Sequence, residues 1–246
     1  MSGVLDGRVA LVTGASRGIG AATAIELARL GARVVITART QGGLEETDDA
    51  ICALGIRAPG IRALGGGEAT ILPLDLRDGA QIDAIGPTLF QRFGRLDILV
   101  HNAGALGKLT PVSHILPDDW ADVVGVNLSA AWRLIRTCDP LLRQGPSGRA
   151  VFVTESRARE PRAYWGAMGA TKAGMEHLVL TWAQEVATTT MRVNLFDPGP
   201  VATRMRSNAF PGENPKTLPG PEAVATTLAA LCLPAEERNG ALVKTG

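Results

Sequence analysis

A group of glycines after a short apolar stretch is the first feature of the sequence suited to chemistry. Gly14, Gly18 and Gly20 follow the apolar residues 9–12, and a helical pattern begins directly after them. A strand, turn and helix of this kind direct backbone N–H groups and the helix dipole to one point, where a phosphate binds. Glycine suits the turn because a Cβ atom would block the close approach of a pyrophosphate. The alternative is an ordinary glycine-rich turn, since the spacing G-x-x-x-G-x-G differs from the commoner G-x-G-x-x-G.

Two arginines near this turn bear on the choice of nucleotide. Arg17 lies inside the turn, and Arg39 follows the β-branched run at residues 33–37. An acidic residue at the end of such a strand accepts hydrogen bonds from a ribose 2′-hydroxyl, whereas an arginine suits a 2′-phosphate. The pair therefore favours NADP(H) over NAD(H), and the alternative for each arginine is an exposed charge that promotes solubility.

Polar or small residues follow two further strand-like stretches. Asp75 closes the stretch at residues 70–75, and Asn102-Ala103-Gly104 follows residues 96–101. The carboxyl ends of parallel strands share one edge of a sheet, and ligands bind at that edge. Asp75 is therefore either a carboxylate at the ligand edge or a cap of the helix that begins near Asp78. The small residues at 102–104 leave room for a flat ring.

Strand-like and helix-like segments alternate along all 246 residues. This rhythm predicts βαβ units and hence an α/β fold with a doubly wound parallel sheet, in three α/β/α layers (a Rossmann fold) and one domain over residues 1–246. The expected strands are residues 8–13, 33–37, 70–75, 96–101, 149–154, 191–196 and 241–243, and the expected helices are residues 18–30, 41–54, 78–93, 118–144, 167–187 and 220–232. Residues 203–218 are polar with several prolines, which indicates a mobile flap over a ligand.

The composition of the chain and the spacing of its apolar stretches and cysteines exclude several classes of protein. The net charge of +1 recruits neither nucleic acid nor an anionic membrane. No stretch reaches the length of a membrane span, and the N-terminus lacks a signal-peptide pattern. Cys52, Cys138 and Cys232 are far apart in the sequence, so we expect no metal site and reduced thiols in a cytoplasmic protein. A repeated Gly-Ile-Arg-Ala within residues 55–65 is interpreted as a small duplication in a surface loop.

Together these segments resemble the short-chain dehydrogenase/reductase family over nearly the full length of the chain. The resemblance implies an oxidoreductase fold that holds a nicotinamide dinucleotide and a small-molecule substrate. Asp75 and Leu76 stand where the family touches adenine, and the hydroxyl of Thr203 stands where the family reaches the nicotinamide carboxamide. The implied cofactor residues are Gly14, Ser16, Arg17, Gly18, Ile19, Gly20, Arg39, Asp75, Leu76, Asn102, Ala103, Gly104, Lys172, Pro198, Gly199 and Thr203.

The family's reaction uses a tyrosine, a lysine four residues later and a serine about thirteen residues before the tyrosine. The phenol protonates the carbonyl oxygen as hydride arrives, the serine hydrogen-bonds that oxygen, and the lysine holds the nicotinamide ribose and lowers the tyrosine pKa from about 10. The segment 169–173 matches the family around Lys172, which places Met168 in the tyrosine position and Glu155 in the serine position. Asn127 matches the family's helix asparagine, whose backbone holds a water near the lysine. Since asparagine is a poor helix former, the alternative is a side chain bonded to a nearby backbone carbonyl.

Met168 and Glu155 lack the chemistry of the residues that they replace. Methionine carries no transferable proton, and an ionised glutamate repels the alkoxide that forms on the substrate. Losing a positioned general acid costs roughly 10²- to 10⁴-fold in rate. The leading hypothesis is therefore an NADP(H)-binding member of the family whose oxidoreductase activity is absent or strongly reduced.

Two alternatives stay open. In the first, the chain is an active NADP-dependent oxidoreductase on a small carbonyl or alcohol substrate, with Glu155 as an acid whose pKa is raised by burial, or with Tyr164 reaching in from one helical turn earlier. Ser156 is a poor replacement for the serine because neighbouring residues of an extended segment point to opposite sides. In the second, the chain is a structural or interaction subunit with a vestigial cofactor site. The resemblance also implies a homodimer or homotetramer formed through the helices at 118–144 and 167–187.

Overall fold

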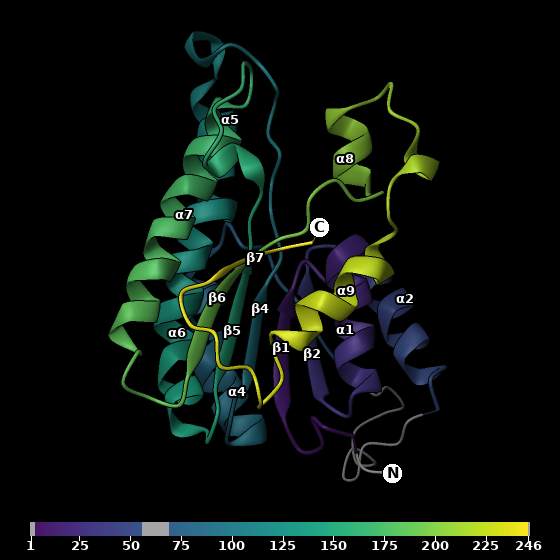
Figure 1. Cartoon of the computed structure of the whole chain (residues 1–246), viewed down its shortest axis with the longest axis vertical. Helices are drawn as coiled ribbons and strands as arrows, with labels where there is room; N and C mark the ends of the chain where they lie inside the picture. The colour runs from purple at the N-terminus through teal and green to yellow at the C-terminus, as the bar shows by residue number, and fades with distance from the viewer. Residues whose placement is uncertain (1–2, 56–68, 246) are drawn as a thin grey trace.

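Among the residues that the structure describes, seven parallel strands form one sheet in the order β3-β2-β1-β4-β5-β6-β7. The computed structural model describes residues 3–55 and 69–245 (Figure 1), so the duplication expected at residues 55–65 lies outside the described residues except for Gly55. The strands are β1 Val9–Thr13, β2 Arg33–Ala38, β3 Ala69–Pro73, β4 Ile98–His101, β5 Arg149–Val153, β6 Arg192–Asp197 and β7 Leu242–Lys244. The predicted doubly wound parallel sheet is confirmed.

Two groups of helices cover the two faces of this sheet (Figure 1). On one face lie α1 Gly18–Arg29, α2 Gln41–Cys52 and α9 Pro221–Ala230, and on the other lie α3 Gly79–Asp83, α4 Ile85–Phe93, α6 Ala130–Gln144 and α7 Gly166–Glu185. Each face has its own hydrophobic core, because successive side chains of a strand point to opposite sides. In β1, Val9 and Leu11 join one core, whereas Ala10 and Val12 join the other.

The helix expected at residues 78–93 is two helices, α3 and α4, which meet at Ala84. Pro87 has no N–H to donate to the carbonyl of Asp83, so the helical hydrogen-bond ladder breaks there. Thr137 takes the place of the missing donor: its Oγ1 donates to that carbonyl at 3.0 Å. Asp78 caps α3 by accepting from the backbone N–H groups of residues 80 and 81, so the cap is Asp78 and not Asp75.

The helix expected at residues 118–144 also departs from a single α-helix. It consists of α5 Pro117–Val124, a π-helical stretch η2 Gly125–Ser129, and α6. Asn127 lies inside η2, and its side chain is fully buried. A π-helical turn inserts one residue into a helix and is common at functional sites. The poor helix former that the sequence places at position 127 therefore marks a change of helix type.

The segment predicted as a flap carries short helices beyond the carboxyl ends of the strands (Figure 1). Residues 203–218 contain α8 Arg204–Ala209 and the 3-10 turn η4 Pro215–Thr217. Thr203 caps α8, since its Oγ1 accepts from the backbone N–H of Arg206 at 3.2 Å. Two further 3-10 turns, η1 Val112–His114 and η3 Ser156–Ala158, lie before α5 and after β5. Within the described residues, no helix has both the length and the hydropathy needed to span a membrane.

Candidate functional site

A cleft of about 910 Å³ runs along the carboxyl ends of the strands, and the segments that follow β1 to β6 all line it. The chain order of the sheet reverses between β1 and β4, because β2 and β3 lie to one side of β1 and all later strands lie to the other. Ligands of doubly wound folds bind in the crevice at such a switch point. Of the cofactor and catalytic residues expected from the sequence, all line this cleft except Gly20 and Asn127, which are buried, and the alternative acid Tyr164, which is exposed.

The glycines of the turn after β1 pack closely against the loop that follows β4. Gly14 and Gly18 have positive φ angles of 66° and 57°, which other residues rarely adopt. Gly20 packs against the segment after β4: a Cβ atom there would lie 2.4 Å from Nδ2 of Asn102. A Cβ atom on Gly14 would lie 2.8 Å from Cα of Ala103. The glycines therefore permit the close packing of two loops, a role that the sequence analysis did not anticipate.

A hydrogen-bond network joins these two loops at the switch point. Nδ2 of Asn102 donates to the carbonyl oxygens of Thr13 and Gly14, both at 3.2 Å. Oγ1 of Thr13 accepts from the backbone N–H of Ala103 at 3.2 Å and lies 3.0 Å from Nδ1 of His101. Burial lowers the pKa of His101 to about 3, so this imidazole is neutral. Thr13 and His101 were missed from the sequence because each reads as an ordinary strand residue.

The charged residues at the outer end of the cleft differ in how they are engaged. Arg17 and Arg39 are exposed, and neither has a carboxylate partner among the residues that the structure describes. Asp75 is paired with Arg77 at 2.6 Å, and hydrogen bonds from Arg77 lower the pKa of the Asp75 carboxyl. Arg77 also reaches Asp122 at 3.3 Å. The two unpaired guanidinium groups are thus available to an anion, whereas the Asp75 carboxylate is already bound.

Asn127 ties the π-helical stretch to the segment after β4. Its Oδ1 accepts from the backbone N–H of Ala105 at 2.7 Å, and its Nδ2 donates to the carbonyl of Ala105 at 2.9 Å. The bonded residue is 22 positions away, so the side chain does not bond a local carbonyl as one reading of the sequence held. Nδ2 also lies 3.1 Å from Oγ1 of Thr171 and 3.4 Å from Sδ of Met168. One asparagine therefore connects the loop after β4 to α7.

Lys172 and Met168 lie one helical turn apart on α7, and both line the cleft. The ammonium group of Lys172 donates to the carbonyl of Val153 at 2.6 Å. Burial lowers the pKa of Lys172 to about 8, and the nearby carboxylates of Glu155 and Glu176 oppose this shift. Met168 is 5% exposed, so its thioether forms part of the cleft wall beside the lysine.

Glu155 enters the cleft directly after β5, in extended backbone. Its Oε1 is buried and has no hydrogen-bond partner in the described part of the chain. Burial raises the pKa of this carboxyl, while a backbone hydrogen bond from Arg157 partly opposes the rise. Both observations show that the surroundings of Glu155 disfavour its charged form.

Tyr164 stands apart from these groups. Helix α7 begins at Gly166, so the expectation that Tyr164 lies one helical turn before Met168 is wrong. Its backbone has a φ of 75°, its side chain is exposed, and it is not among the described residues that line the cleft. The left-handed backbone at residue 164 turns the chain into α7 and leaves the phenol at the surface.

Comparisons with known proteins agree with this architecture. The family model for short chain dehydrogenases matches residues 8–214. The chain is 35% identical over 218 residues to the uncharacterized oxidoreductase YciK of Escherichia coli K12, covering 89% of this chain and 83% of that protein. It is 32% identical over 200 residues to the 3-oxoacyl-[acyl-carrier-protein] reductase FabG of Salmonella typhimurium, covering 81% of this chain and 76% of that one.

Solved structures resemble the whole chain. A short chain dehydrogenase from Escherichia coli CFT073, solved in complex with NADPH, superposes with a TM-score of 0.89 at 32% identity and covers 99% of this chain and 98% of its own. A short chain dehydrogenase from Pseudomonas syringae superposes with a TM-score of 0.89 at 35% identity and covers 99% of this chain and 97% of its own.

Proposed function

The chain belongs to the short-chain dehydrogenase family, and from that premise we propose that it binds NADP(H) while its oxidoreductase activity is absent or strongly reduced. The observation that carries the proposal is the pair Met168 and Lys172, which line the cleft one helical turn apart. The lysine that holds a cofactor ribose in the family is present, and a thioether occupies the position of the proton donor.

Binding of NADP(H) is supported by the shape and charge of the outer cleft. The glycine turn presents backbone N–H groups at the start of α1, where a pyrophosphate fits. The unpaired Arg17 and Arg39 suit a 2′-phosphate. Thr203 already accepts a hydrogen bond as the cap of α8, yet its hydroxyl hydrogen stays free to donate to a carboxamide. A relative from Shigella flexneri 2a was solved in complex with NADP.

Reduction of a carbonyl needs both hydride and a proton. A bound nicotinamide supplies the hydride, and this chain must supply the proton. Met168 has no hydrogen to give, and its sulfur accepts only weakly. Lys172 donates one hydrogen bond to the carbonyl of Val153, and its remaining N–H groups are proposed to hold the cofactor ribose. With no phenol beside the lysine, the developing alkoxide lacks its usual partner, and a loss of roughly 10²- to 10⁴-fold in rate follows.

Calorimetry with NADPH and NADH tests the binding half of this proposal. We expect measurable binding of NADPH and weaker binding of NADH, with no consumption of either nucleotide when a set of aldehydes and ketones is added. Robust turnover by the unmodified protein would contradict the proposed loss of activity. Failure to bind either nucleotide would favour the other reading, a structural or interaction subunit with a vestigial cofactor site.

A second candidate function rests on Glu155. Its buried Oε1 lacks a partner, and its pKa is raised by burial, so a protonated Glu155 can donate to a substrate oxygen in an active NADP-dependent oxidoreductase. Reduction would then require the acid form and would fall as the pH rises through the raised pKa. Glu155→Gln should abolish turnover in that case, and an unchanged rate would rule the residue out. Tyr164, exposed and outside α7, has no such support.

Assembly and location follow as further parts of the proposal. Trp120 on α5, Trp132 on α6 and Leu180 on α7 are exposed apolar side chains on the two long helical elements. A homodimer or homotetramer through these elements would cover them, and sedimentation of the purified chain measures the assembly. The three cysteines are unpaired, which agrees with a reducing compartment such as the cytoplasm.

A further inference from the structure

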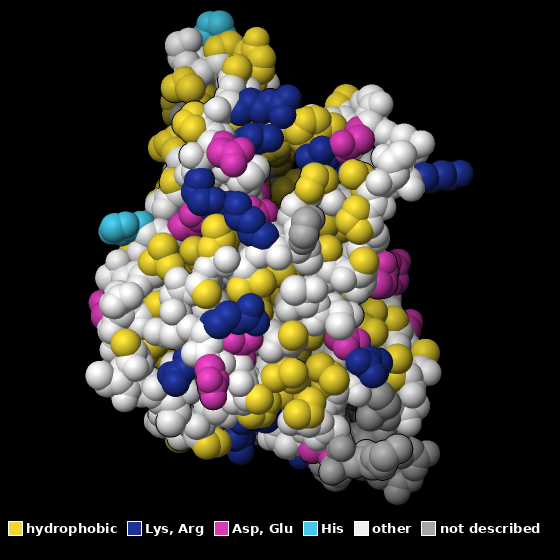
Figure 2. Space-filling model, viewed as in Figure 1, with side chains coloured by type: hydrophobic (Ala, Val, Ile, Leu, Met, Phe, Trp, Pro, Cys, Tyr) yellow, Lys and Arg dark blue, Asp and Glu magenta, His cyan; other side chains and the backbone are white. Residues whose placement is uncertain are grey.

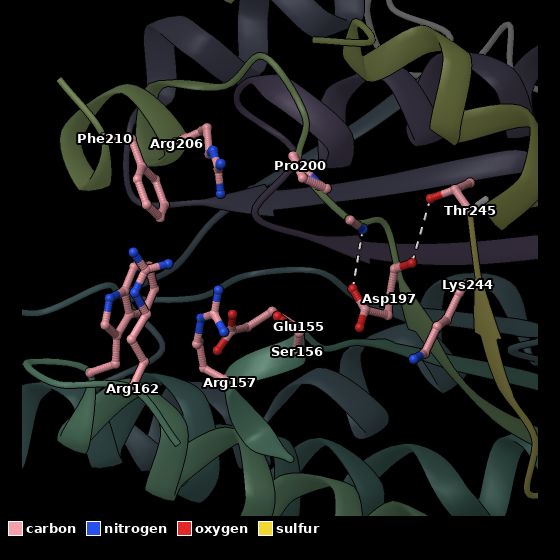
Figure 3. Close-up of a pocket in the computed structure, with 12 residues that line it drawn as sticks. Glu155, Ser156, Arg157, Arg162, Asp197, Pro200, Arg206, Phe210, Lys244 and Thr245 are labelled. Carbon is pink, nitrogen blue, oxygen red and sulfur yellow. Dashed lines mark hydrogen bonds between the residues drawn. The ribbon is translucent and has the colours of Figure 1, made fainter. Parts of the chain in front are cut away.

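A pocket of about 310 Å³ branches from the cleft between the segments that follow β5, β6 and β7 (Figure 3). It shares part of its wall with the main cleft, namely Glu155, Trp165, Gly199, Arg206 and Phe210. Gly199 belongs to the segment that is proposed to contact the nicotinamide. The branch pocket therefore lies beside the place where a substrate would meet the cofactor.

Positive side chains dominate the walls of the branch pocket. Figure 3 shows Arg206 extending from the flap and Arg157 from the opposite wall, with Arg162 beside them and Lys244 farther along. Figure 2 shows Lys and Arg side chains gathered along the hollow between the flap and the helices opposite. Two of these charges are partly enclosed, since the side chains of Arg157 and Arg206 are 21% and 25% exposed, whereas Arg162 and Lys244 are exposed.

The carboxylates of the same pocket do not balance these charges. Asp197 is already engaged, since its Oδ2 accepts from Arg159 at 2.5 Å and its Oδ1 accepts from the backbone N–H of Gly199 at 3.1 Å. The other carboxyl, Glu155, contributes at most one negative charge, against four cations in the same wall. The pocket thus keeps an excess of positive charge.

Not all of the cations have partners of their own. Arg206 is bound to Glu213 at 2.6 Å, and Arg157 lies 3.7 Å from Glu160. Arg162 and Lys244 have no carboxylate partner among the residues that the structure describes. Arg162 is the free cation nearest to the other two guanidinium groups, and it gives an incoming anion a charge that no side chain of the protein already neutralises.

Two aromatic rings hold the guanidinium groups in place. The guanidinium carbons of Arg206 and Arg162 lie 3.7 Å and 5.6 Å from the ring centre of Phe210. That of Arg157 lies 5.8 Å from the ring of Trp165, and the two rings are 5.7 Å apart. Cation–π contacts reduce the freedom of the arginines, so less entropy is lost when they bind an anion. The rings also offer a flat apolar surface.

We propose that the branch pocket binds a small molecule with a carboxylate or phosphate group on a planar apolar body, the anionic oxygens on Arg157 and Arg162 and the planar part against Trp165 and Phe210. This inference rests on the proposed function, because it assigns a ligand class to the substrate end of the same cleft. Guanidinium groups suit carboxylate and phosphate oxygens because they donate parallel hydrogen bonds to both.

Calorimetry in the presence of saturating NADP⁺ tests the assignment. The probes are benzoate, phenyl phosphate and the neutral benzyl alcohol, which share one ring and differ in charge. We expect at least one of the two anions to bind and benzyl alcohol not to bind, with an affinity that falls as KCl is added. Comparing benzoate with phenyl phosphate identifies which anion the pocket takes. Benzyl alcohol binding as tightly as both anions, or no anion binding at all, would overturn the inference.

Arg162→Gln should weaken binding of the anionic probe by roughly tenfold or more, as expected for the loss of a charged hydrogen-bond donor. Arg92→Gln is the matched control, because Arg92 also lies over a phenylalanine ring, Phe93, at 5.5 Å but lines neither the cleft nor the branch pocket. Equal affinity in Arg162→Gln and the parent chain would overturn the inference. A separate titration with NADP⁺ alone distinguishes this failure from failure of the proposed function, since only the latter abolishes cofactor binding.

Discussion

The two halves of the cleft differ in how their polar groups are arranged. On the β1–β4 side, hydrogen bonds join Asn102, Thr13 and His101 to the neighbouring backbone and to one another, the glycines pack closely on them, and only Nε2 of His101 lacks a partner among the described residues. On the β5–β6 side, Glu155 keeps an unpaired buried oxygen, and Met168 adds a thioether to the wall. We propose that the first half holds the nucleotide and that the second lacks the polar groups that act on a carbonyl in the family.

This contrast teaches that binding and chemistry depend on different strands. The nucleotide half uses backbone N–H groups and small residues, which tolerate little change because loops pack directly on them. The reaction half uses side chains at the end of β5 and the start of α7, which line the cleft. On the proposed function, this chain keeps its cofactor cleft although its proton donor is replaced.

Restoring the reaction half should give the largest effect. The double substitution Glu155→Ser and Met168→Tyr places a phenol one turn before Lys172 and a hydroxyl after β5. We expect carbonyl reduction with NADPH to rise by roughly 10²-fold or more, since a positioned general acid contributes that much. The initial rate of NADPH consumption measures it. A double variant that folds and binds NADPH yet stays as inactive as the parent chain would mean that the scaffold lacks more than these two side chains.

Removing the Asn127 side chain, which connects the loop after β4 to α7, should lower the free energy of unfolding. Asn127→Ala leaves the N–H and carbonyl groups of Ala105 without their partners, so we expect a loss of about 3 kcal/mol in the free energy of unfolding. Urea denaturation measures this loss, and Gln91→Ala, at an exposed position of α4, is the control. A loss no greater than that of the control would show that Asn127 does not hold the loop after β4.

Weakening the nucleotide half should alter cofactor preference. Arg17→Ala and Arg39→Ala each remove an unpaired guanidinium from the outer cleft, and we expect each to weaken NADPH binding by about tenfold. Binding of NADH, which has no 2′-phosphate, should stay the same. Arg29→Ala serves as the control, because Arg29 lies on α1, the helix that follows the turn, and is paired with Glu26. Equal losses for both nucleotides would contradict a role in 2′-phosphate recognition.

Lys172 should give the stability of the protein a pH dependence. Its pKa is lowered from 10.5 to about 8 in the folded chain, so between these values the unfolded chain binds more protons. Stability therefore rises with pH across that range, by at most about 1.4 kcal/mol per pH unit. Urea denaturation at several pH values should show a rise that Lys172→Met lacks. Identical pH profiles for the two proteins would contradict the lowered pKa.

Local sequence patterns were enough to predict the strands of the sheet, the helices between them and most residues of the cleft. Alternating apolar stretches and glycine turns define β1 to β6, and the residues after each strand then meet at one edge. Features that depend on contacts between distant segments were not predictable. The break at Ala84 needs Thr137, and the π-helical turn at Asn127 needs Ala105, 22 residues away.

The branch pocket also depends on contacts between distant segments, so it could not be predicted from the sequence. Nothing local in the sequence indicates that Trp165 and Phe210 gather Arg157, Arg162 and Arg206. Glu155 and Met168, by contrast, were singled out by the resemblance to the family, by counting back from Lys172. Their partners and burial came only from the structure.

The most direct test follows the absorbance of reduced nicotinamide in NADPH bound to the unmodified protein while aldehydes and ketones are added, including ones that carry a carboxylate or phosphate. A cleft that holds the nucleotide but lacks a proton donor predicts that bound NADPH stays reduced. Oxidation of the bound NADPH at the rates of ordinary enzymes, about 1 to 10³ per second, would contradict it and would make the chain a working reductase.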